Sequence, residues 1–233
     1  MKIHESVAQG TDQWRRLRAG LPTASEMHKI ITPVGKRSEQ RHRYMARLLV
    51  EKLTGNPIDD VPEGLFDVER GKNLEAEAIR KYEYIRDCDT RTVGFVTAAD
   101  GKTGCSPDRL LIGARGSLEM KVPNPEIHMM YALGFGAVSK DHWVQVQGQL
   151  YVMDEIDFVD VMSYCPGLPD SLVRVERDED FQDAMNDCII DFLEAFDGHY
   201  ARCVENGWLR PEGPSVEELA AQAVASGAKV PAL

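Results

Sequence analysis

The sequence predicts a single α/β domain in which helices flank a mixed central sheet. Three observations favour this fold class. The chain has 233 residues, which is enough for one large hydrophobic core. Helical patterns come first, and a cluster of short strands, further helices, two strands and a long helix follow in that order. Neither a repeat nor a linker interrupts the order, so we expect one domain over residues 1–210 and a partly disordered tail over 211–233.

The first part of the chain is predicted to be helical. A short helix is expected over residues 11–18, with a threonine as its N-cap. Thr23 and Glu26 have the spacing of a capping box, which predicts the start of a second helix. A longer helix is expected over residues 38–53, closed by a glycine, and another over residues 68–86.

Alternating and Val-rich segments predict the strands of the sheet. They are residues 92–97, 103–106, 109–112, 117–122, 156–164 and 172–176. Helices are expected between and after them, at residues 125–133, 139–153 and 180–206. This alternation is typical of one mixed sheet with helical layers.

The charge of the chain is unevenly distributed. The net charge is −11, which by itself argues against a nucleic-acid partner. Residues 1–47 hold ten basic and four acidic side chains, or +6, whereas the remainder carries −17. This division suits a protein that holds a polyanion at one face, and a helix with Arg41, Arg43 and Arg47 is a candidate for contacts with a DNA backbone. A solvated helix face explains the same charges without any ligand.

Several classes of protein are disfavoured. No apolar stretch approaches the ~20 residues that a membrane span needs, and the N-terminus lacks the apolar core of a signal peptide, so we expect a cytoplasmic protein without membrane contact. The five cysteines are widely spaced and form no CxxC pair, which argues against a zinc site, an iron–sulfur cluster or a disulfide framework. His128 and His142 stand alone and are better explained as structural residues than as metal ligands.

A short pattern of charged residues indicates chemistry. Asp108 follows a proline, and Glu119-Met120-Lys121 comes after ten further residues. Alternate residues of a strand share a face, so Glu119 and Lys121 project together while Met120 points to the opposite face. If the two flanking strands pair as a hairpin, Asp108 lies near the same end of the sheet. Two carboxylates and one ammonium would then converge.

Such a group of side chains suits the hydrolysis of a phosphodiester. Carboxylate oxygens bind Mg²⁺, and the metal stabilises charge on the phosphate and lowers the pKa of a bound water. Lys121 can orient that water or assist its deprotonation. The alternative is a surface Glu–Lys pair on an edge strand, and the short pattern alone does not decide between the two.

Longer motifs in the same order resemble a known nuclease family. Residues 105–108 (CSPD) and 118–123 (LEMKVP) resemble the active-site motif of the phage lambda-type exonucleases, also called YqaJ-like recombinases or alkaline exonucleases, within the PD-(D/E)xK superfamily. Residues 14–25 are similar to the family's WxxLRxGxxTAS signature, 71–75 to its GKxxE segment and 144–147 to its QVQ segment. The matches extend from residue 11 to about 180, so the resemblance implies a restriction-endonuclease-like core for most of the chain.

The resemblance implies a metal site. Asp108 and Glu119 are similar to the family's metal-binding carboxylates, and the backbone carbonyl of Met120 would be a further ligand. Glu75 resembles the helix-borne acid that supports a second metal or its water shell, although without the resemblance nothing favours it over Glu77. The implied cofactor is Mg²⁺, with Mn²⁺ as a substitute and one or two ions per site.

Further residues are implied in catalysis. Lys121 resembles the residue that activates or aligns the nucleophilic water, and Gln147 resembles one that contacts the substrate or that water. Gln147 and Tyr151 also match the QxxxY element of related nucleases. A polar helix face is the alternative for Gln147. Arg109 departs from the family pattern, in which glycine follows the catalytic aspartate, and we expect its side chain to point away along its strand.

Arg18 and Ser25 resemble the family's pocket for the 5′-phosphate of a DNA end. Thr23 and Ser25 also lie at a predicted helix N-terminus, where free N–H groups and the helix dipole favour an anion. Arg18 would add a bidentate contact with the phosphate. Arg41 and Tyr151 are further expected DNA contacts. Plain capping by Thr23, with Ser25 exposed to solvent, is the alternative.

The resemblance implies a 5′→3′ exonuclease that degrades one strand of linear double-stranded DNA to mononucleotides and leaves a 3′ overhang. Members of the family form a ring-shaped homotrimer and work with a single-strand annealing recombinase, which places the chain in a bacterium or a phage-infected host. The alternatives are a structure-specific endonuclease of the same superfamily, a non-catalytic module that binds DNA ends, and an interaction protein with a fortuitous motif.

Overall fold

The computed structural model describes residues 1–5, 7–58, 65–135, 138 and 140–208. The tail expected over residues 211–233 lies outside this part of the chain. Among the described residues, no helix is long and apolar enough to cross a membrane.

A five-stranded mixed sheet forms the centre of the molecule. In spatial order it contains β2 (Thr90–Arg91), β5 (Arg109–Leu111), β6 (Gly116–Lys121), β7 (Phe158–Ser163) and β8 (Ser171–Glu176). Strands β6 and β7 run parallel, and the other neighbours are antiparallel. The expected hairpin of β5 and β6 is therefore confirmed, and so is the mixed character of the sheet.

A second, smaller sheet is antiparallel and has the order β1 (Lys2–His4), β3 (Phe95–Thr97) and β4 (Gly104–Cys105). Strands β1 and β2 were not expected from the sequence. They have three and two residues, which is too short for a recognisable alternation, and they depend on partners about 90 and 20 residues away in the chain.

Seven helical segments surround the sheets in the described part of the chain. They are α1 (Asp12–Arg18), η1 (Ala24–Lys29), α2 (Arg41–Thr54), α3 (Leu65–Arg86), α4 (Pro125–Ala132), α5 (Lys140–Val152) and α6 (Glu179–Glu205). The oxygen of Thr11 accepts the N–H of Trp14 and so caps α1 as expected. Gly55 ends α2 with a φ of 66°, the left-handed conformation that glycine adopts without strain.

The expected capping box at the second helix is wrong. Thr23 precedes a 3₁₀ segment, η1, and its side chain makes no capping bond. Its N–H donates instead to the hydroxyl of Tyr44 on α2, at 3.2 Å. Glu26 forms an ion pair with Lys29 rather than reaching back to Thr23. Tertiary partners therefore replace the local bonds that the spacing predicted.

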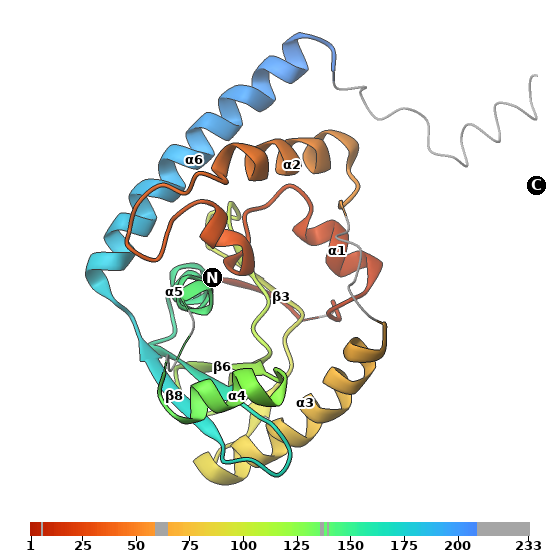
Figure 1. Ribbon diagram of the computed structural model, residues 1–233. Coiled ribbons are helices and arrows are strands. Elements are labelled where there is room, and N and C mark those ends of the chain that lie inside the picture. The colour runs from red at the N-terminus through yellow and green to blue at the C-terminus, as the bar shows by residue number, and fades with distance from the viewer. Residues whose placement is uncertain (6, 59–64, 136–137, 139, 209–233) are drawn as a thin grey trace, which may run out of the picture.

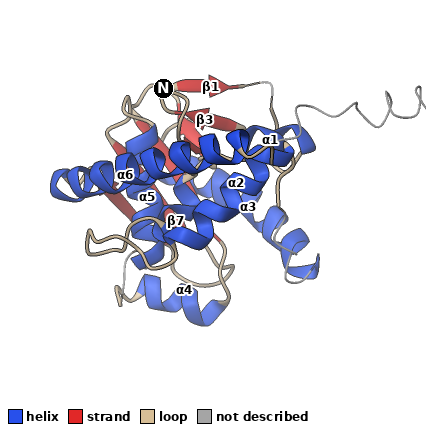
Figure 2. Cartoon of the chain, turned by 90° about the horizontal axis from the view of Figure 1, so that it is seen from above, coloured by secondary structure: helices blue, strands red, loops and turns tan. Residues whose placement is uncertain are grey.

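The molecule is layered around α5. In Figure 1 this helix is seen almost end-on, between the central sheet and the outer pair α2 and α6, and Figure 2 shows the same outer pair from above. The larger core cluster lies among α5, η1, α2, α6 and one face of the sheet, and it includes Met27, Val146, Leu150 and Phe192. A smaller cluster joins α3 to the other face.

Gly148 lets α5 approach η1 closely. A Cβ atom at this position would lie 2.6 Å from the sulfur of Met27 and 3.2 Å from the Cα of Ala24, both in η1. Any side chain at this position would therefore push η1 away from α5.

Candidate active site

Strand β6 places the side chains of Glu119 and Lys121 on the face covered by α5. Glu119 is only 4% exposed, and its Oε1 accepts a bond from the Nζ of Lys121 at 2.8 Å. Leu118 and Met120 belong to the cluster on the α3 side. The predicted alternation of β6 is confirmed, because successive side chains reach opposite faces.

Asp108 lies beside this pair at the start of β5. Its Oδ2 accepts the backbone N–H of Met120 at 2.6 Å. Burial raises the pKa of Asp108 well above its ordinary value, and the charges of Glu119 and Glu75 raise it further, whereas the Met120 N–H and Lys121 act in the opposite direction. The expected convergence of acidic side chains is therefore present. We call Asp108, Glu119 and Lys121, together with Glu75, the acidic group.

The same electrostatic effect distinguishes Glu75 from its neighbour Glu77. The negative charge of Glu75 raises the pKa of the Asp108 carboxyl. Glu77 accepts the hydroxyl of Tyr164 at 2.5 Å. Of the two glutamates that the sequence could not separate, Glu75 is thus the one that influences the acidic group.

Two glutamines of α5 hold Glu119 in place, and neither was predicted. The amide of Gln145 donates to Glu119 Oε1 at 2.7 Å, and its oxygen accepts from Lys121 Nζ at 3.2 Å. The amide of Gln149 donates to Glu119 Oε2 at 2.6 Å. Residues four apart on a helix share a face, so the phase of α5 was the signal that could have identified this pair.

The structure corrects the positions expected for Gln147 and Tyr151. The Gln147 side chain is fully buried on the opposite side of α5, where its amide donates to the carbonyl of Glu176 and its oxygen accepts the N–H of Asp178. The Tyr151 hydroxyl donates to Asn186 on α6, at 3.2 Å. Both side chains therefore bind α5 to the start of α6 and lie away from Glu119.

Arg41 is also displaced from its expected role. Its guanidinium forms an ion pair with Asp191 on α6, and Arg37 donates to the other oxygen of the same carboxylate at 2.9 Å. The contact joins α2 to α6. The expected contact of Arg41 with DNA stays a prediction.

The three residues expected to hold a 5′-phosphate lie together. The guanidinium of Arg18 is 3.4 Å from the hydroxyl oxygens of both Thr23 and Ser25, and it stacks 4.2 Å above the ring of Trp14. The Trp14 indole N–H donates to Ser106 at 2.8 Å, which fixes the ring. Burial lowers the pKa of Arg18, so a partner that supplies negative charge would compensate for its lost hydration.

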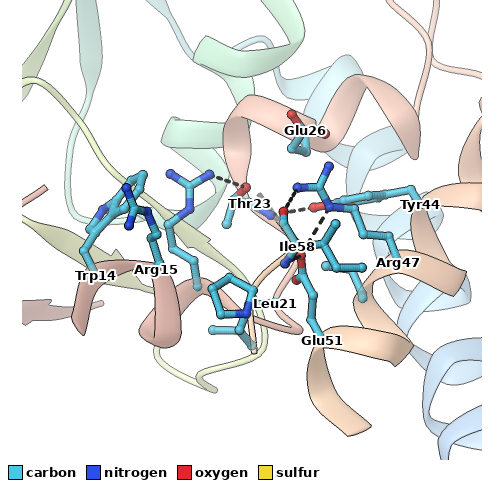
Figure 3. Close-up of a pocket in the computed structure, with 13 residues that line it drawn as sticks. Trp14, Arg15, Leu21, Thr23, Glu26, Tyr44, Arg47, Glu51 and Ile58 are labelled. Atoms are coloured by element: carbon cyan, nitrogen blue, oxygen red, sulfur yellow. Dashed lines mark hydrogen bonds and ion pairs between the residues drawn. The ribbon is translucent and has the colours of Figure 1, made fainter. Parts of the chain in front are cut away.

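Trp14, Arg18 and Thr23 line a cavity of about 260 Å³, which we call the Arg18 cavity (Figure 3). Its lining includes Trp14, Arg15, Arg18, Thr23, Glu26, Tyr44, Arg47, Glu51 and Ile58. The cavity lies on the side of the chain that leads to the acidic group, because Trp14 in its lining donates to Ser106, two residues before Asp108, and Thr23 forms a β-bridge with Gly104.

The remaining candidates have structural partners. Arg109 donates to the hydroxyl and the carbonyl of Thr90 at 2.8 and 3.2 Å, so its side chain points across to β2, as expected for a residue that leaves the acidic group open. His128 is buried between Ser163 and the carbonyl of Pro169. These contacts agree with the structural role expected for this histidine.

The acidic group suits a hard divalent ion by its chemistry. Its donors are oxygen atoms, the carboxylates of Asp108, Glu119 and Glu75 repel one another, and the buried Oε1 of Gln149 has no hydrogen-bond partner within the described structure. Among the described residues, no three His, Cys, Asp or Glu side chains already form a metal cage. Glu119 is instead held by Lys121 and the glutamines. The carbonyl of Met120 stays a predicted ligand.

Comparisons with known proteins agree with this arrangement. Residues 13–155 match the YqaJ-like viral recombinase domain. The alkaline exonuclease LHK-Exo from Laribacter hongkongensis is 24% identical, with a TM-score of 0.73 over 84% of this chain and 98% of its own. Its complex with dAMP gives 25% identity, with the same TM-score and coverage.

A phage related exonuclease from Haemophilus somnus 129PT has a TM-score of 0.60 and 15% identity, over 78% of this chain and 96% of its own. No curated protein is similar enough to count as a match. The expected PD-(D/E)xK-like fold, with a mixed sheet flanked by helices, is therefore confirmed.

Proposed function

The chain belongs to the YqaJ-like viral recombinase family, and from this we propose that it is a Mg²⁺-dependent exonuclease that degrades one strand of linear double-stranded DNA from its 5′ end. The observation that carries the proposal is that Trp14 and Thr23 of the Arg18 cavity contact Ser106 and Gly104, in the segment that leads to Asp108. One site can hold the phosphate of a DNA end, and its neighbour can hydrolyse the next phosphodiester.

The residues of the acidic group have separate roles in the proposed reaction. Mg²⁺, or Mn²⁺ in its place, with one or two ions per site, would stabilise charge on the scissile phosphate and lower the pKa of a water. Asp108, Glu119 and Glu75 would bind the metal. Lys121 would align the attacking water or accept its proton, with its Nζ held between Glu119 and Gln145.

The Arg18 cavity supports the proposed direction of digestion. A 5′-phosphate held by Arg18, Thr23 and Ser25 would leave the first phosphodiester of the strand at the acidic group. Each cut would then release a mononucleotide and expose a new 5′-phosphate, so that a 3′ overhang grows. We further propose a ring-shaped homotrimer around the DNA and a single-strand annealing recombinase as the partner that takes up the overhang.

A structure-specific endonuclease and a non-catalytic end-binding module are the competing functions. The Arg18 cavity favours an enzyme that begins at an end, because a half-buried arginine beside two hydroxyls suits a terminal phosphate. The presence of Asp108, Glu119 and Lys121 in one hydrogen-bonded group favours catalysis over binding alone.

The test is digestion of linear duplex DNA with 5′-phosphate or 5′-hydroxyl ends, in Mg²⁺ and in chelator. We expect digestion only with metal, and no digestion of covalently closed circles. Lys121→Ala should lose activity and still bind DNA, whereas the control Lys102→Ala, which removes a surface ion pair with Asp197, should digest normally. Normal digestion by Lys121→Ala would refute the catalytic assignment, and cleavage of closed circles would favour the endonuclease.

A second arm tests the 5′-phosphate. Arg18→Ala should reduce the preference for a 5′-phosphate over a 5′-hydroxyl end by roughly tenfold or more, because a charge-assisted bond is lost at a buried position. An equal loss of activity on both ends would contradict the assigned role of Arg18 and leave the catalytic assignment standing.

A further inference from the structure

A second cavity adjoins the Arg18 cavity on the side away from the acidic group. It has a volume of about 440 Å³, and its lining comprises Lys29, Gln40, Arg43, Tyr44, Arg47 and Ile58. We call it the Arg43 cavity. Tyr44, Arg47 and Ile58 line both cavities, so the two spaces share a wall.

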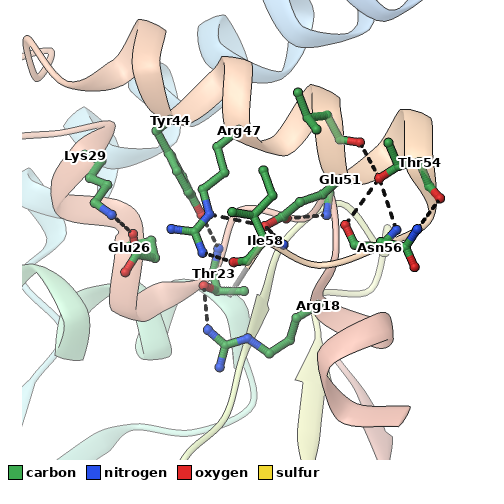
Figure 4. A network of polar contacts seen from close by, with 12 residues as sticks. Arg18, Thr23, Glu26, Lys29, Tyr44, Arg47, Glu51, Thr54, Asn56 and Ile58 are labelled. Atoms are coloured by element: carbon green, nitrogen blue, oxygen red, sulfur yellow. Dashed lines mark hydrogen bonds and ion pairs between the residues drawn. The ribbon is translucent and has the colours of Figure 1, made fainter. Parts of the chain in front are cut away.

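The order of the contacts fixes where the Arg43 cavity lies. Arg18 contacts Thr23, whose N–H in turn donates to Tyr44. Figure 4 shows Thr23 between Arg18 and Arg47. Trp14, which Figure 3 shows on the other side of the Arg18 cavity from Tyr44 and Arg47, donates to Ser106 near Asp108, so the sequence of sites is the acidic group, the Arg18 cavity and then the Arg43 cavity.

Three cationic side chains line the Arg43 cavity, and two of them have carboxylate partners just outside its lining. Lys29 forms an ion pair with Glu26, and Arg47 forms one with Glu51. The side chain of Arg43 is exposed and forms no ion pair with any residue in the described part of the chain. Its surroundings therefore suit an anionic ligand.

Arg47 is held rigidly at the shared wall. Its Nε donates to Glu51 at 3.2 Å, and its terminal nitrogen donates to the carbonyl of Ile58. Glu51 is itself buried and accepts the N–H groups of Gly20 and Ile58 at 2.9 and 3.1 Å. Glu51 therefore balances the charge of Arg47 and holds its guanidinium at the shared wall, which leaves Arg43 as the cation that a ligand in the Arg43 cavity can pair with.

The size of the Arg43 cavity indicates more than a phosphate ion. Its volume lies in the range of roughly 300–1,000 Å³ that is typical of sites for whole small molecules. The half-exposed side chain of Ile58 offers an apolar surface in the same cavity as Arg43. This combination suits a nucleotide, with a phosphate at Arg43 and a base against the apolar wall.

We propose that the Arg43 cavity binds an unpaired 5′-terminal nucleotide, so that the enzyme accepts DNA ends with a short 5′ overhang. The inference rests on the proposed function. With a blunt end, the terminal phosphate occupies the Arg18 cavity. With a one-nucleotide overhang, the first internal phosphodiester occupies the Arg18 cavity, and the terminal nucleotide lies in the Arg43 cavity.

The binding mode changes the first product. Water attacks the phosphorus of the next phosphodiester, the bond from phosphorus to the 3′ oxygen breaks, and that oxygen leaves with a proton as a 3′-hydroxyl. The remaining strand keeps the 5′-phosphate. The released fragment is then a 5′-phosphorylated dinucleotide, and later cuts release mononucleotides as from a blunt end.

The test compares the first product from two linear duplexes, one blunt and one with a one-nucleotide 5′ overhang, both 5′-phosphorylated and radiolabelled. Wild-type enzyme should release a mononucleotide from the first and mainly a dinucleotide from the second. Arg43→Ala should reduce the share of dinucleotide roughly tenfold, the factor that about 1.4 kcal/mol represents. Arg43→Lys should retain most of it, because the positive charge remains.

Arg115→Ala is the matched control, since it removes another exposed arginine that is paired with Asp157 at the start of β6. It should leave the product ratio unchanged. A mononucleotide as the first product from the overhang, or an unaltered ratio in Arg43→Ala, would overturn the inference, while digestion of the blunt duplex would leave the proposed function intact. If neither duplex is digested in Mg²⁺, both the function and the inference are wrong.

Discussion

Both faces of α5 carry glutamines, but the glutamines of the two faces bind different parts of the molecule. On the face toward β6, Gln145 and Gln149 donate to the two oxygens of Glu119. On the face toward α6, Gln147 bonds with the backbone of Glu176 and Asp178 and with the side chain of Gln182. All three glutamines are at least partly buried, so burial does not separate them.

The difference between the faces is one of helical phase. Two residues along an α-helix correspond to a rotation of about 200°, which places Gln147 opposite Gln145. A motif that includes both residues therefore includes one that supports the acidic group and one that fixes the helix to its neighbour. Substitutions on the two faces should separate these contributions, since one face affects activity and the other affects stability.

The largest effect is expected at the carboxylate that the first face holds. Glu119→Gln keeps the size of the side chain but removes the charge that would bind the metal. We expect the rate of digestion to fall roughly a thousandfold or more, with the circular dichroism spectrum preserved. Activity within tenfold of wild type would show that Glu119 is not a metal ligand.

Gln145→Ala tests the support given to Lys121 and Glu119. The variant removes the amide that joins the two side chains, so Lys121 loses part of its alignment. We expect a loss of roughly 10–100-fold in kcat/KM, as is typical for partners of metal ligands, and a melting temperature close to that of wild type. A loss of stability with unchanged kcat/KM would assign Gln145 to the structural face.

Gln147→Ala should have the opposite result. It leaves the N–H of Asp178 without its acceptor and the Gln182 amide with only the backbone carbonyl of residue 147, which costs about 1–3 kcal/mol of unfolding free energy. The rate per folded molecule should stay near that of wild type. Urea unfolding and active-site-normalised digestion measure the two quantities, and a selective loss of activity would restore the catalytic role first expected for Gln147.

Asp108→Asn tests whether the ionised carboxyl of Asp108 lowers the stability of the protein when no metal is bound. The folded-state pKa of Asp108 is raised, chiefly by burial, so the contribution of its protonated form is present below the unfolded pKa of about 3.9 and is lost as pH rises through the folded pKa. In chelator, the variant should match wild type near pH 4. At pH 8 it should melt higher, by roughly 2–4 °C for each kcal/mol gained. An equal pH dependence in both proteins would contradict this account.

The sequence was informative where structure depends on neighbours in the chain. The positions of Glu119 and Lys121 follow from the alternation of one strand, and that of Asp108 follows from a hairpin. It was less informative where a distant element decides. Thr23 forms no capping box, since its N–H donates to Tyr44 and its hydroxyl accepts from Arg18, and β1 and β2 exist only through their partners.

The glutamines show a third situation. The sequence located the segment over residues 144–147 but not which of its side chains faces β6, because that depends on how α5 is rotated in the fold. The rotation is set by packing on both sides, including buried Val144, Val146 and Leu150. A resemblance in sequence can therefore identify the helix and still assign the role to the wrong residue.

Gly148 links the two parts of the proposed site. It lies on α5 next to Gln149, which holds Glu119, and its missing side chain allows contact with Ala24, which lies between Thr23 and Ser25. The separation between the place that would hold a DNA end and the place that would cut it therefore depends on this contact. In the proposed nuclease, the distance between the phosphate site and the cutting site would determine the length of each released fragment. Gly148, which has no side chain, would therefore help to determine that length.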